Sequence, residues 1–197
     1  NDWRELAFCD PVYATRLANS AVGEPAVLRF NCESMRTPNS VFDYNMRTRK
    51  KTLLKENRVL GGFDRSNYLT ERLDATARDG TRVPVSLLYH KDVKRNGTAP
   101  LYLYAYGSYG SSTSPSFRST MFSLVDRGFV YAIAHVRGGQ EHGRTWYEDG
   151  KLMKKKNTFM DFIDCAQHLV KEKYVNPACL FAGGGSAGGL LIGAVAN

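Results

Sequence analysis

One serine in this sequence lies in a setting that favours nucleophilic chemistry. Residues 184–188 read Gly-Gly-Ser-Ala-Gly and fit the pattern G-x-S-x-G, with Ser186 at its centre. The apolar segment CLFAGG (179–184) precedes this serine, and a helix-like segment follows it. A strand, a tight glycine turn and a helix form a nucleophile elbow, which lifts the serine hydroxyl above the sheet edge. The pattern therefore predicts Ser186 as a nucleophile, with the backbone amide of Ala187 placed to donate to an oxyanion.

Other interpretations of the glycine run are weaker. A glycine-rich turn before a helix can bind phosphate, but no Lys-Ser/Thr pair follows it, so the Walker pattern fails. The pattern G-x-G-x-x-G fits residues 183–188, but glycine runs produce it by chance, and no acidic residue follows as a dinucleotide site requires. An ordinary strand-to-helix turn without chemistry is the remaining alternative to an elbow.

A serine nucleophile needs a general base, usually a histidine oriented by a carboxylate. In the α/β-hydrolase order both partners follow the serine, whereas no Asp, Glu or His follows Ser186 here. All four histidines precede the serine, at positions 90, 135, 142 and 168. We expect His135 at a strand end, His142 in a glycine-rich loop and His168 on the polar side of a helix. Structural or exposed roles are predicted for them, not a catalytic one.

Strands and helices alternate after residue 67 or so. The dipeptide Asp79-Gly80 between two alternating runs predicts a hairpin. Asn157 is predicted to cap the clearest helix. Further strands are expected at 100–107, 129–136 and 179–184, with helices at 119–128, 157–173 and from 186. This order predicts an α/β fold with a mostly parallel sheet and crossover helices.

Residues 1–67 have a different character. Short β-type segments at 26–30, 40–46 and 51–56 are separated by turn-forming residues. The last two, joined by a basic turn, predict an antiparallel hairpin. Such spacing indicates a β-meander that is too small to close a barrel or propeller alone.

The net charge of +8 does not by itself indicate a nucleic-acid partner. The basic runs at 47–51 and 151–156 carry no nucleic-acid-binding motif, and we expect both in solvated turns. No apolar run approaches the length of a membrane span. We therefore expect neither nucleic acid nor a membrane as a partner.

The cysteines indicate neither a metal site nor a redox motif. None belongs to a C-x-x-C pair or to a zinc-type histidine pattern, so we expect no metal and no cofactor. Free thiols in a reducing compartment, and hence a cytoplasmic location, are expected for this set. The four cysteines are Cys9, Cys32, Cys165 and Cys179.

Four long segments together resemble the prolyl oligopeptidase family of serine peptidases, and most of all its oligopeptidase B group. They span most of residues 61–197 and read GGFDRSNYLTERLDATARDGTRVPVSLLYHKD, PLYLYAYGSYG, AHVRGGQEHGRTWYEDGKLMKKKNTFMDFIDCAQHLV and GGGSAGGLLIGAVAN. The resemblance implies that residues 68–197 form the N-terminal part of an α/β-hydrolase catalytic domain. It also implies that residues 1–67 form the C-terminal part of a β-propeller.

The resemblance also implies an activity and its residues. The family hydrolyses short peptides through an acyl-enzyme, and the oligopeptidase B group implies cleavage after Arg or Lys. Ser186 would be the nucleophile. Tyr106, in YAYGSYG, would supply the oxyanion-hole hydroxyl and Ala187 the second, backbone donor. The RGGQEHG loop (137–143) receives no catalytic role.

The sequence departs from the family after the nucleophile. The family's triad Asp and His, and the acidic residues that select a basic side chain, follow the serine and are not present here. We therefore expect a fragment of a larger enzyme that is inactive alone. Two alternatives stay open: another α/β-hydrolase, such as an esterase or a dipeptidyl or acylaminoacyl peptidase, and a non-catalytic interaction module.

Overall fold

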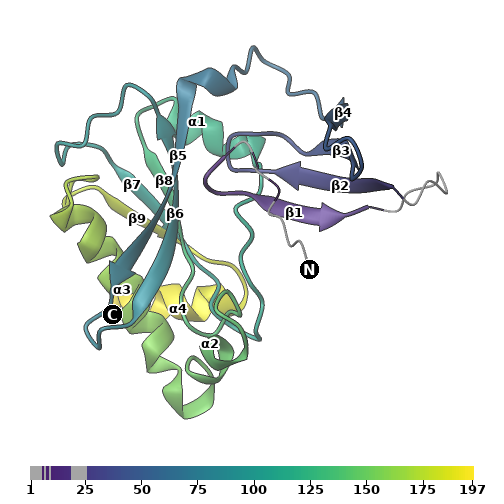
Figure 1. The fold of residues 1–197 in the computed structure, drawn as a ribbon. Helices are drawn as coiled ribbons and strands as arrows, with labels where there is room; N and C mark the ends of the chain where they lie inside the picture. Colours follow the sequence, from purple (N-terminus) through teal and green to yellow (C-terminus); the bar gives the residue numbers. More distant parts are fainter. Residues whose placement is uncertain (1–5, 7, 9, 19–25) are drawn as a thin grey trace.

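Two β-sheets of different kinds make up the protein (Figure 1). A computed structural model describes residues 6, 8, 10–18 and 26–197. Cys9, one of the predicted free thiols, lies outside these residues. Among the others, Cys165 and Cys179 are free thiols.

The first sheet is a four-stranded antiparallel meander. Its strands follow one another in chain order, as the sequence predicted for this region. Asn45 Oδ1 accepts hydrogen bonds from the amides of Arg47 and Thr48, which closes the basic turn between the last two strands. The strands are β1 (Ala14–Leu17), β2 (Val27–Glu33), β3 (Ser40–Asn45) and β4 (Lys51–Glu56). The assignment of this sheet to a propeller stays a prediction.

The second sheet has five strands in the order β5-β6-β8-β7-β9. The predicted hairpin around Asp79-Gly80 is present, with Thr76 opposite Arg82. Strand β8 pairs antiparallel with β6 and parallel with β7, and β7 pairs parallel with β9. The sheet is therefore mixed rather than mostly parallel, because the hairpin adds two antiparallel pairings at one side. Its strands are β5 (Tyr68–Thr76), β6 (Arg82–His90), β7 (Leu101–Tyr104), β8 (Val130–Ala134) and β9 (Leu180–Gly183).

Helices follow each of the parallel strands. The sequence predicted those within 119–128, at 157–173 and from 186, but not the short helix at 144–148. The helices are α1 (Phe122–Val125), α2 (Arg144–Glu148), α3 (Lys156–Lys171) and α4 (Ala187–Ala196), with short 3-10 turns at Arg65–Asn67, Ser119–Met121 and Leu152–Lys154. The predicted cap of α3 is wrong, because Lys155 occupies the N-cap position, and its side chain makes no capping hydrogen bond to the helix. Asn157 instead donates from Nδ2 to the Asp149 carbonyl at 2.9 Å, so it fixes the preceding loop.

Both faces of the second sheet are covered, which explains why its central strands are continuously apolar. All five residues of β8 are buried. Val130, Ala132 and Ala134 pack in one cluster with residues of α3 and α4. Tyr131 and Ile133 point to the other face and pack with residues of α1. The sheet is thus the middle layer between two unequal helical layers.

The apolar run of β9 is typical of a buried strand, but the strand is exposed. Leu180 is 42% exposed and Phe181 is 53% exposed. The reason is its place in the sheet: β9 pairs with β7 on one side, and no described strand pairs with its other side. An apolar run predicts a strand but does not reveal whether that strand lies at the centre or the edge.

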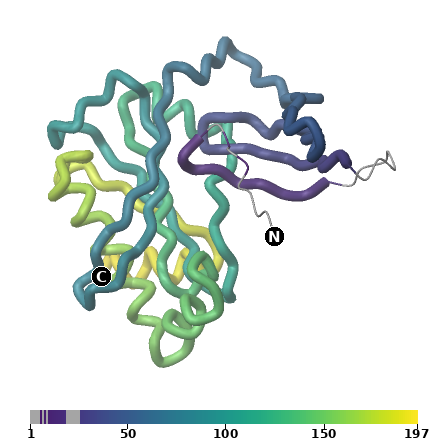
Figure 2. Tube along the Cα trace, viewed as in Figure 1, coloured from purple at the N-terminus to yellow at the C-terminus, as the bar shows by residue number. Residues whose placement is uncertain are grey.

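A buried aspartate joins the N-terminal segment to both sheets. Asp10 accepts hydrogen bonds from Ser34 Oγ at 2.7 Å and Thr37 Oγ1 at 2.6 Å, and from Arg36 Nε at 2.6 Å. The same arginine donates from Nη1 to the carbonyl of Tyr68, the first residue of β5. In space, the described part of this N-terminal segment runs along the end of the first sheet that faces the second sheet (Figure 2). Burial alone would raise the pKa of Asp10, but these hydrogen bonds hold it below its ordinary value.

We expect Asp10→Asn to lower the free energy of unfolding by about 3–5 kcal/mol at neutral pH, because the arginine loses its buried partner. The native pKa of Asp10 lies below the unfolded value of about 3.9. The contribution of Asp10 to the free energy of unfolding is therefore fully present above the unfolded pKa. It is lost as the pH falls through the native pKa. Denaturant unfolding from pH 7 to pH 3 should show the difference between the two proteins shrinking.

Asp92→Asn is the matched control for this measurement, since the Asp92 side chain is 79% exposed. It should change stability by less than about 0.5 kcal/mol. A loss as large in the control, or a difference for Asp10→Asn that persists unchanged to pH 3, would contradict this account of Asp10.

Candidate active site

The parallel strands bring the predicted site residues to one edge of the second sheet. Tyr104 at the end of β7 lies opposite Ile133 of β8 and Gly183 of β9, so all three strands end together. Tyr106 follows β7 by two residues, and Ser186 follows β9 by three. Ligands of α/β proteins bind at this carboxyl edge. The topology therefore places Ser186 and Tyr106 where a substrate would bind.

Ser186 has the backbone geometry of a nucleophile elbow. It lies at φ 54° and ψ −119°, in a region that residues other than glycine rarely adopt. Hydrogen bonds of 2.8 Å from Gly188 N to Gly185 O and from Gly189 N to Ser186 O close the turn. The serine is exposed at the start of α4. Strain of this kind marks functional turns and keeps the hydroxyl clear of the sheet.

The first turn of α4 lies directly against the end of β7. A Cβ atom on Gly188 would come within 2.8 Å of the Ala105 carbonyl oxygen and 3.5 Å of Tyr106 Cα. Only glycine allows this approach, because the obstructing atoms belong to the backbone. The contact brings the serine turn and the tyrosine strand end together.

The two predicted oxyanion donors flank this contact. Tyr106 is half-buried beside Gly188. Ala187 is the first residue of α4, and its amide donates to no group among the described residues. An unpaired amide at a helix N-terminus, with the partial positive charge of the helix behind it, suits a developing negative charge. The geometry is compatible with the predicted roles, which stay predictions.

No histidine of the described residues is bonded to Ser186, and its hydroxyl has no partner there. His135 is 2% exposed, with Nε2 2.7 Å from Ser86 Oγ and Nδ1 3.5 Å from Glu141 Oε1. His142 is exposed, and its ring packs edge-on against Trp146.

A buried ion pair and a second, partly exposed one hold the RGGQEHG loop, whose role the sequence left open. Arg137 is buried and donates from Nε and Nη2 to both oxygens of Asp161 on α3, at 2.5–3.2 Å. Its Nη1 also lies 2.7 Å from Asp79 Oδ2. The hydrogen bonds that Arg137 donates to Asp161, and the nearby charge of that carboxylate, raise the pKa of Arg137 above its ordinary value. These contacts hold the start of the loop to α3 and to the β5–β6 hairpin, at the edge of the sheet where β8 ends.

Glu141 ties the same loop to the segment after Tyr106. Its Oε1 accepts a 2.9 Å hydrogen bond from the Thr113 amide. Burial would raise the pKa of Glu141, but the nearby His135 ring and the hydrogen bond from this amide lower it. The carboxylate thus remains charged while it joins two loops.

The basic run at 151–156 predicted a solvated turn, but Lys155 does not lie in one. The residue is half-buried, and Nζ donates to the Gly107 carbonyl at 2.5 Å and to Ser108 Oγ at 2.7 Å. Burial lowers the pKa of Lys155. No sequence signal separates it from the exposed lysines beside it, because its acceptors lie 47–48 residues away.

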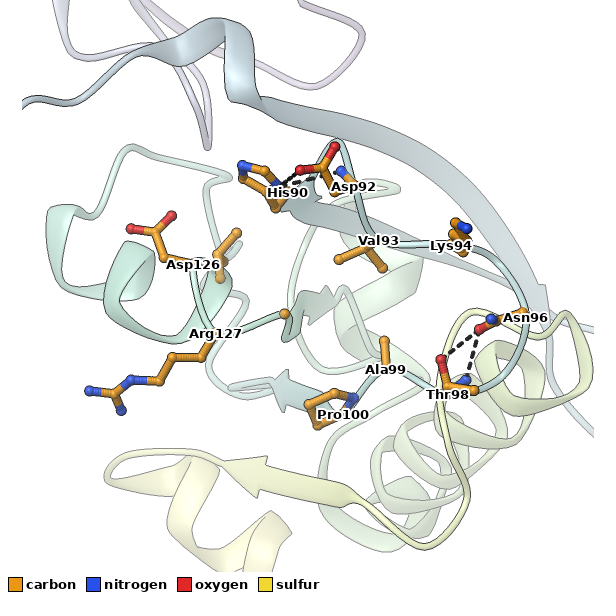
Figure 3. Close-up of a pocket in the computed structure, with 12 residues that line it drawn as sticks. His90, Asp92, Val93, Lys94, Asn96, Thr98, Ala99, Pro100, Asp126 and Arg127 are labelled. Carbon is orange, nitrogen blue, oxygen red and sulfur yellow. Dashed lines mark hydrogen bonds and ion pairs between the residues drawn. The ribbon is translucent and has the colours of Figure 1, made fainter.

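A hollow of about 560 Å³ lies at the opposite edge of the sheet (Figure 3). Pro100 and Gly128, just before β7 and β8, line it, together with the ion pair of His90 Nδ1 and Asp92 Oδ2 at 3.4 Å. This edge carries the amino ends of the parallel strands. It is therefore remote from Ser186 and is not the candidate site.

The described part of the chain holds no cluster of three or more side chains suited to a metal ion. Within the same residues, no helix has both the length and the apolar character to span a membrane.

Comparison with known proteins relates this chain to one family. Residues 115–197 match the family model described as the prolyl oligopeptidase family. The chain is 56% identical over 171 residues to dipeptidyl aminopeptidase BI of Pseudoxanthomonas mexicana, covering 86% of this chain and 24% of that protein. It is 43% identical over 194 residues to protease 2 of Moraxella lacunata. This match covers 98% of this chain and 28% of that protein.

Solved structures lead to the same family. Oligopeptidase B from Trypanosoma brucei, with covalently bound antipain, superposes with a TM-score of 0.87 at 46% identity. The match covers 98% of this chain and 28% of that one. Oligopeptidase B from Leishmania major superposes with a TM-score of 0.86 at 44% identity, covering 96% and 27%. The chain thus spans about a quarter of the length of the relatives it matches.

We expect Gly188→Ala to destabilise the protein by about 1–3 kcal/mol, because the new methyl group meets the Ala105 carbonyl. Gly193→Ala, in the same helix, is the matched control, since a Cβ there meets nothing within 4 Å. Its better helix propensity should leave stability unchanged or raise it by up to about 1 kcal/mol. Thermal unfolding of both variants measures the contrast. Equal stability of the two variants would show that the close approach is not required.

Proposed function

The chain is a relative of the prolyl oligopeptidase family of serine peptidases, and from this premise we propose that the whole protein is a serine-type oligopeptidase. The observation that carries the proposal is the strained, exposed Ser186 beside Tyr106 at the carboxyl edge of the sheet. In this proposal residues 68–197 belong to an α/β-hydrolase catalytic domain. Residues 1–67 belong to the end of a β-propeller.

The proposed reaction begins with attack of Ser186 Oγ on the carbonyl carbon of a peptide bond. A general base takes the hydroxyl proton as the new C–O bond forms. The carbonyl oxygen becomes an oxyanion, which accepts hydrogen bonds from the Ala187 amide and the Tyr106 hydroxyl. Collapse breaks the C–N bond, and the leaving amine takes the proton from the base. Water then hydrolyses the acyl-serine and regenerates Ser186.

We propose that the base and its orienting carboxylate lie outside these 197 residues. His90, His135 and His142 have other partners, His168 lies within α3, and the α/β-hydrolase order places both groups after the serine. The 197-residue chain alone should then be inactive or nearly so. Oxyanion donors without a triad leave only a small fraction of the full rate.

We further propose cleavage after Arg or Lys in short peptides. The similarity to oligopeptidase B along 98% of this chain supports this choice. A second candidate is removal of dipeptides from a free N-terminus, which the 56% identity to a dipeptidyl aminopeptidase favours. The free thiols of Cys165 and Cys179 support a cytoplasmic location. Neither nucleic acid nor a membrane is a proposed partner.

We expect Ser186→Ala to abolish both peptide hydrolysis and fluorophosphonate labelling of the full-length protein. Tyr106→Phe should lower kcat roughly 100-fold, because one oxyanion donor is removed, and should leave KM within about twofold. Steady-state kinetics on a fluorogenic peptide measure both changes. Undiminished hydrolysis by Ser186→Ala would refute the assignment of the nucleophile.

Matched synthetic peptides distinguish the two candidate specificities. We expect the full-length protein to cleave N-terminally blocked peptides after Arg or Lys, and to cleave the Gln-substituted peptides at least tenfold more slowly. Mass spectrometry of the products locates the bond. Cleavage confined to unblocked peptides, with release of dipeptides, would replace the endopeptidase assignment with the second candidate.

A further inference from the structure

Lys155 is a half-buried lysine without an acidic partner in the described part of the chain. Its neighbour Lys154 behaves as surface lysines do, with 61% exposure and an ion pair to Asp149 at 2.7 Å. Removing an ammonium group from water is unfavourable unless other groups bind it. Burial accordingly lowers the pKa of Lys155. Solvation at the surface therefore does not explain why the Lys155 ammonium group lies where it does.

The ammonium group of Lys155 binds the backbone next to Tyr106. Its two hydrogen bonds go to the carbonyl of Gly107, the residue after Tyr106, and to Ser108 Oγ. Gly107 has φ +66°, and a Cβ there would lie 2.4 Å from Thr158 Cγ2. The backbone therefore turns sharply after the tyrosine, in a space that allows no side chain. Lys155 holds the oxygen of this turn with a charge-assisted hydrogen bond.

Tyr106 is thus held from two sides. On one side the first turn of the Ser186 helix meets it, with Gly188 against Ala105 and Tyr106. On the other side Lys155, at the start of α3, holds the next peptide carbonyl. The nearest contacts of both anchors are with the backbone, and the Tyr106 hydroxyl makes no hydrogen bond to the described residues.

We propose that Lys155 is a positioning residue that aims the Tyr106 hydroxyl at the oxyanion, an inference that rests on the proposed function. A displacement of the Gly107 carbonyl would move the tyrosine hydroxyl and weaken its hydrogen bond to the transition state. Small errors of position at a catalytic group lower the rate strongly. A purely structural role, joining α3 to the sheet, would instead affect folding and leave the rate of Tyr106-assisted turnover unchanged.

A double-mutant cycle in the full-length protein tests the proposal. We expect Lys155→Met to lower kcat at least tenfold and to leave KM within twofold. In the Tyr106→Phe background, the same substitution should change kcat less than twofold, because the donor that it positions is already absent. Lys154→Met is the matched control and should keep wild-type kcat and KM.

Two results would overturn the inference: an unchanged kcat in Lys155→Met, or an equal fall in both backgrounds. An unchanged kcat in Tyr106→Phe would overturn it as well. Should Lys155→Met not fold, Ser108→Ala removes one of the two acceptors. It should lower kcat two- to fivefold, but only when Tyr106 is present, and any other result would overturn the inference. Ser186→Ala tests the proposed function separately, since hydrolysis must depend on Ser186 whatever Lys155 does.

Discussion

The approach of the α4 backbone to the end of β7 is the constraint on which the site depends. Gly188 lies so close to the Ala105 carbonyl that no side chain fits between them. The pairing of β7 with β9 ends in the same place, where the Ala105 amide donates to the Gly183 carbonyl at 3.3 Å. The strained turn at Ser186 must begin there, because the chain has to leave the sheet and enter the helix within a few residues. Rigid backbone contacts, rather than flexible side chains, therefore set the separation of serine and tyrosine.

Ion pairs attach helix α3 to the loop after β8 and to the β5–β6 hairpin. Asp161 and Asp164, on its buried side, each bind an arginine fork: Arg137 from the loop after β8 and Arg78 from the hairpin. Breaking a buried pair of this kind costs about 3–5 kcal/mol, because the remaining charge loses its partner. That figure applies to Arg137, since Arg78 is half exposed and its pair is screened by solvent. Lys155 is the N-cap residue of the same helix. Helix α3 therefore orients both the RGGQEHG loop and the turn after Tyr106.

Local sequence rules predicted most elements; the cap of α3 is a local miss, and the other misses arise from long-range packing. The Asp79-Gly80 hairpin, the long helix α3 and the elbow at Ser186 each depend on residues close in sequence, and the structure contains all three. The burial of Lys155 depends on acceptors 47–48 residues away, so its basic run gave no hint of it. The exposure of β9 depends on which strand occupies the sheet edge. The family resemblance is confirmed by the comparisons, whereas the site roles and domain boundaries stay predictions.

Two serines of this chain show why composition alone does not make a nucleophile. Ser86, His135 and Glu141 have the residue types and order of contacts of a hydrolase triad, at 2.7 and 3.5 Å. Ser86 nevertheless lies in the regular strand β6 with no exposed surface, so no carbonyl carbon can reach its hydroxyl. Ser186 has the reverse properties: an exposed hydroxyl on a strained turn, with no base bonded to it among the described residues. Access and an oxyanion site are the properties that the fold must supply locally, whereas a base can approach from another part of a larger protein. The triad-like set in the core therefore cannot receive a substrate, and Ser186 stays the predicted nucleophile.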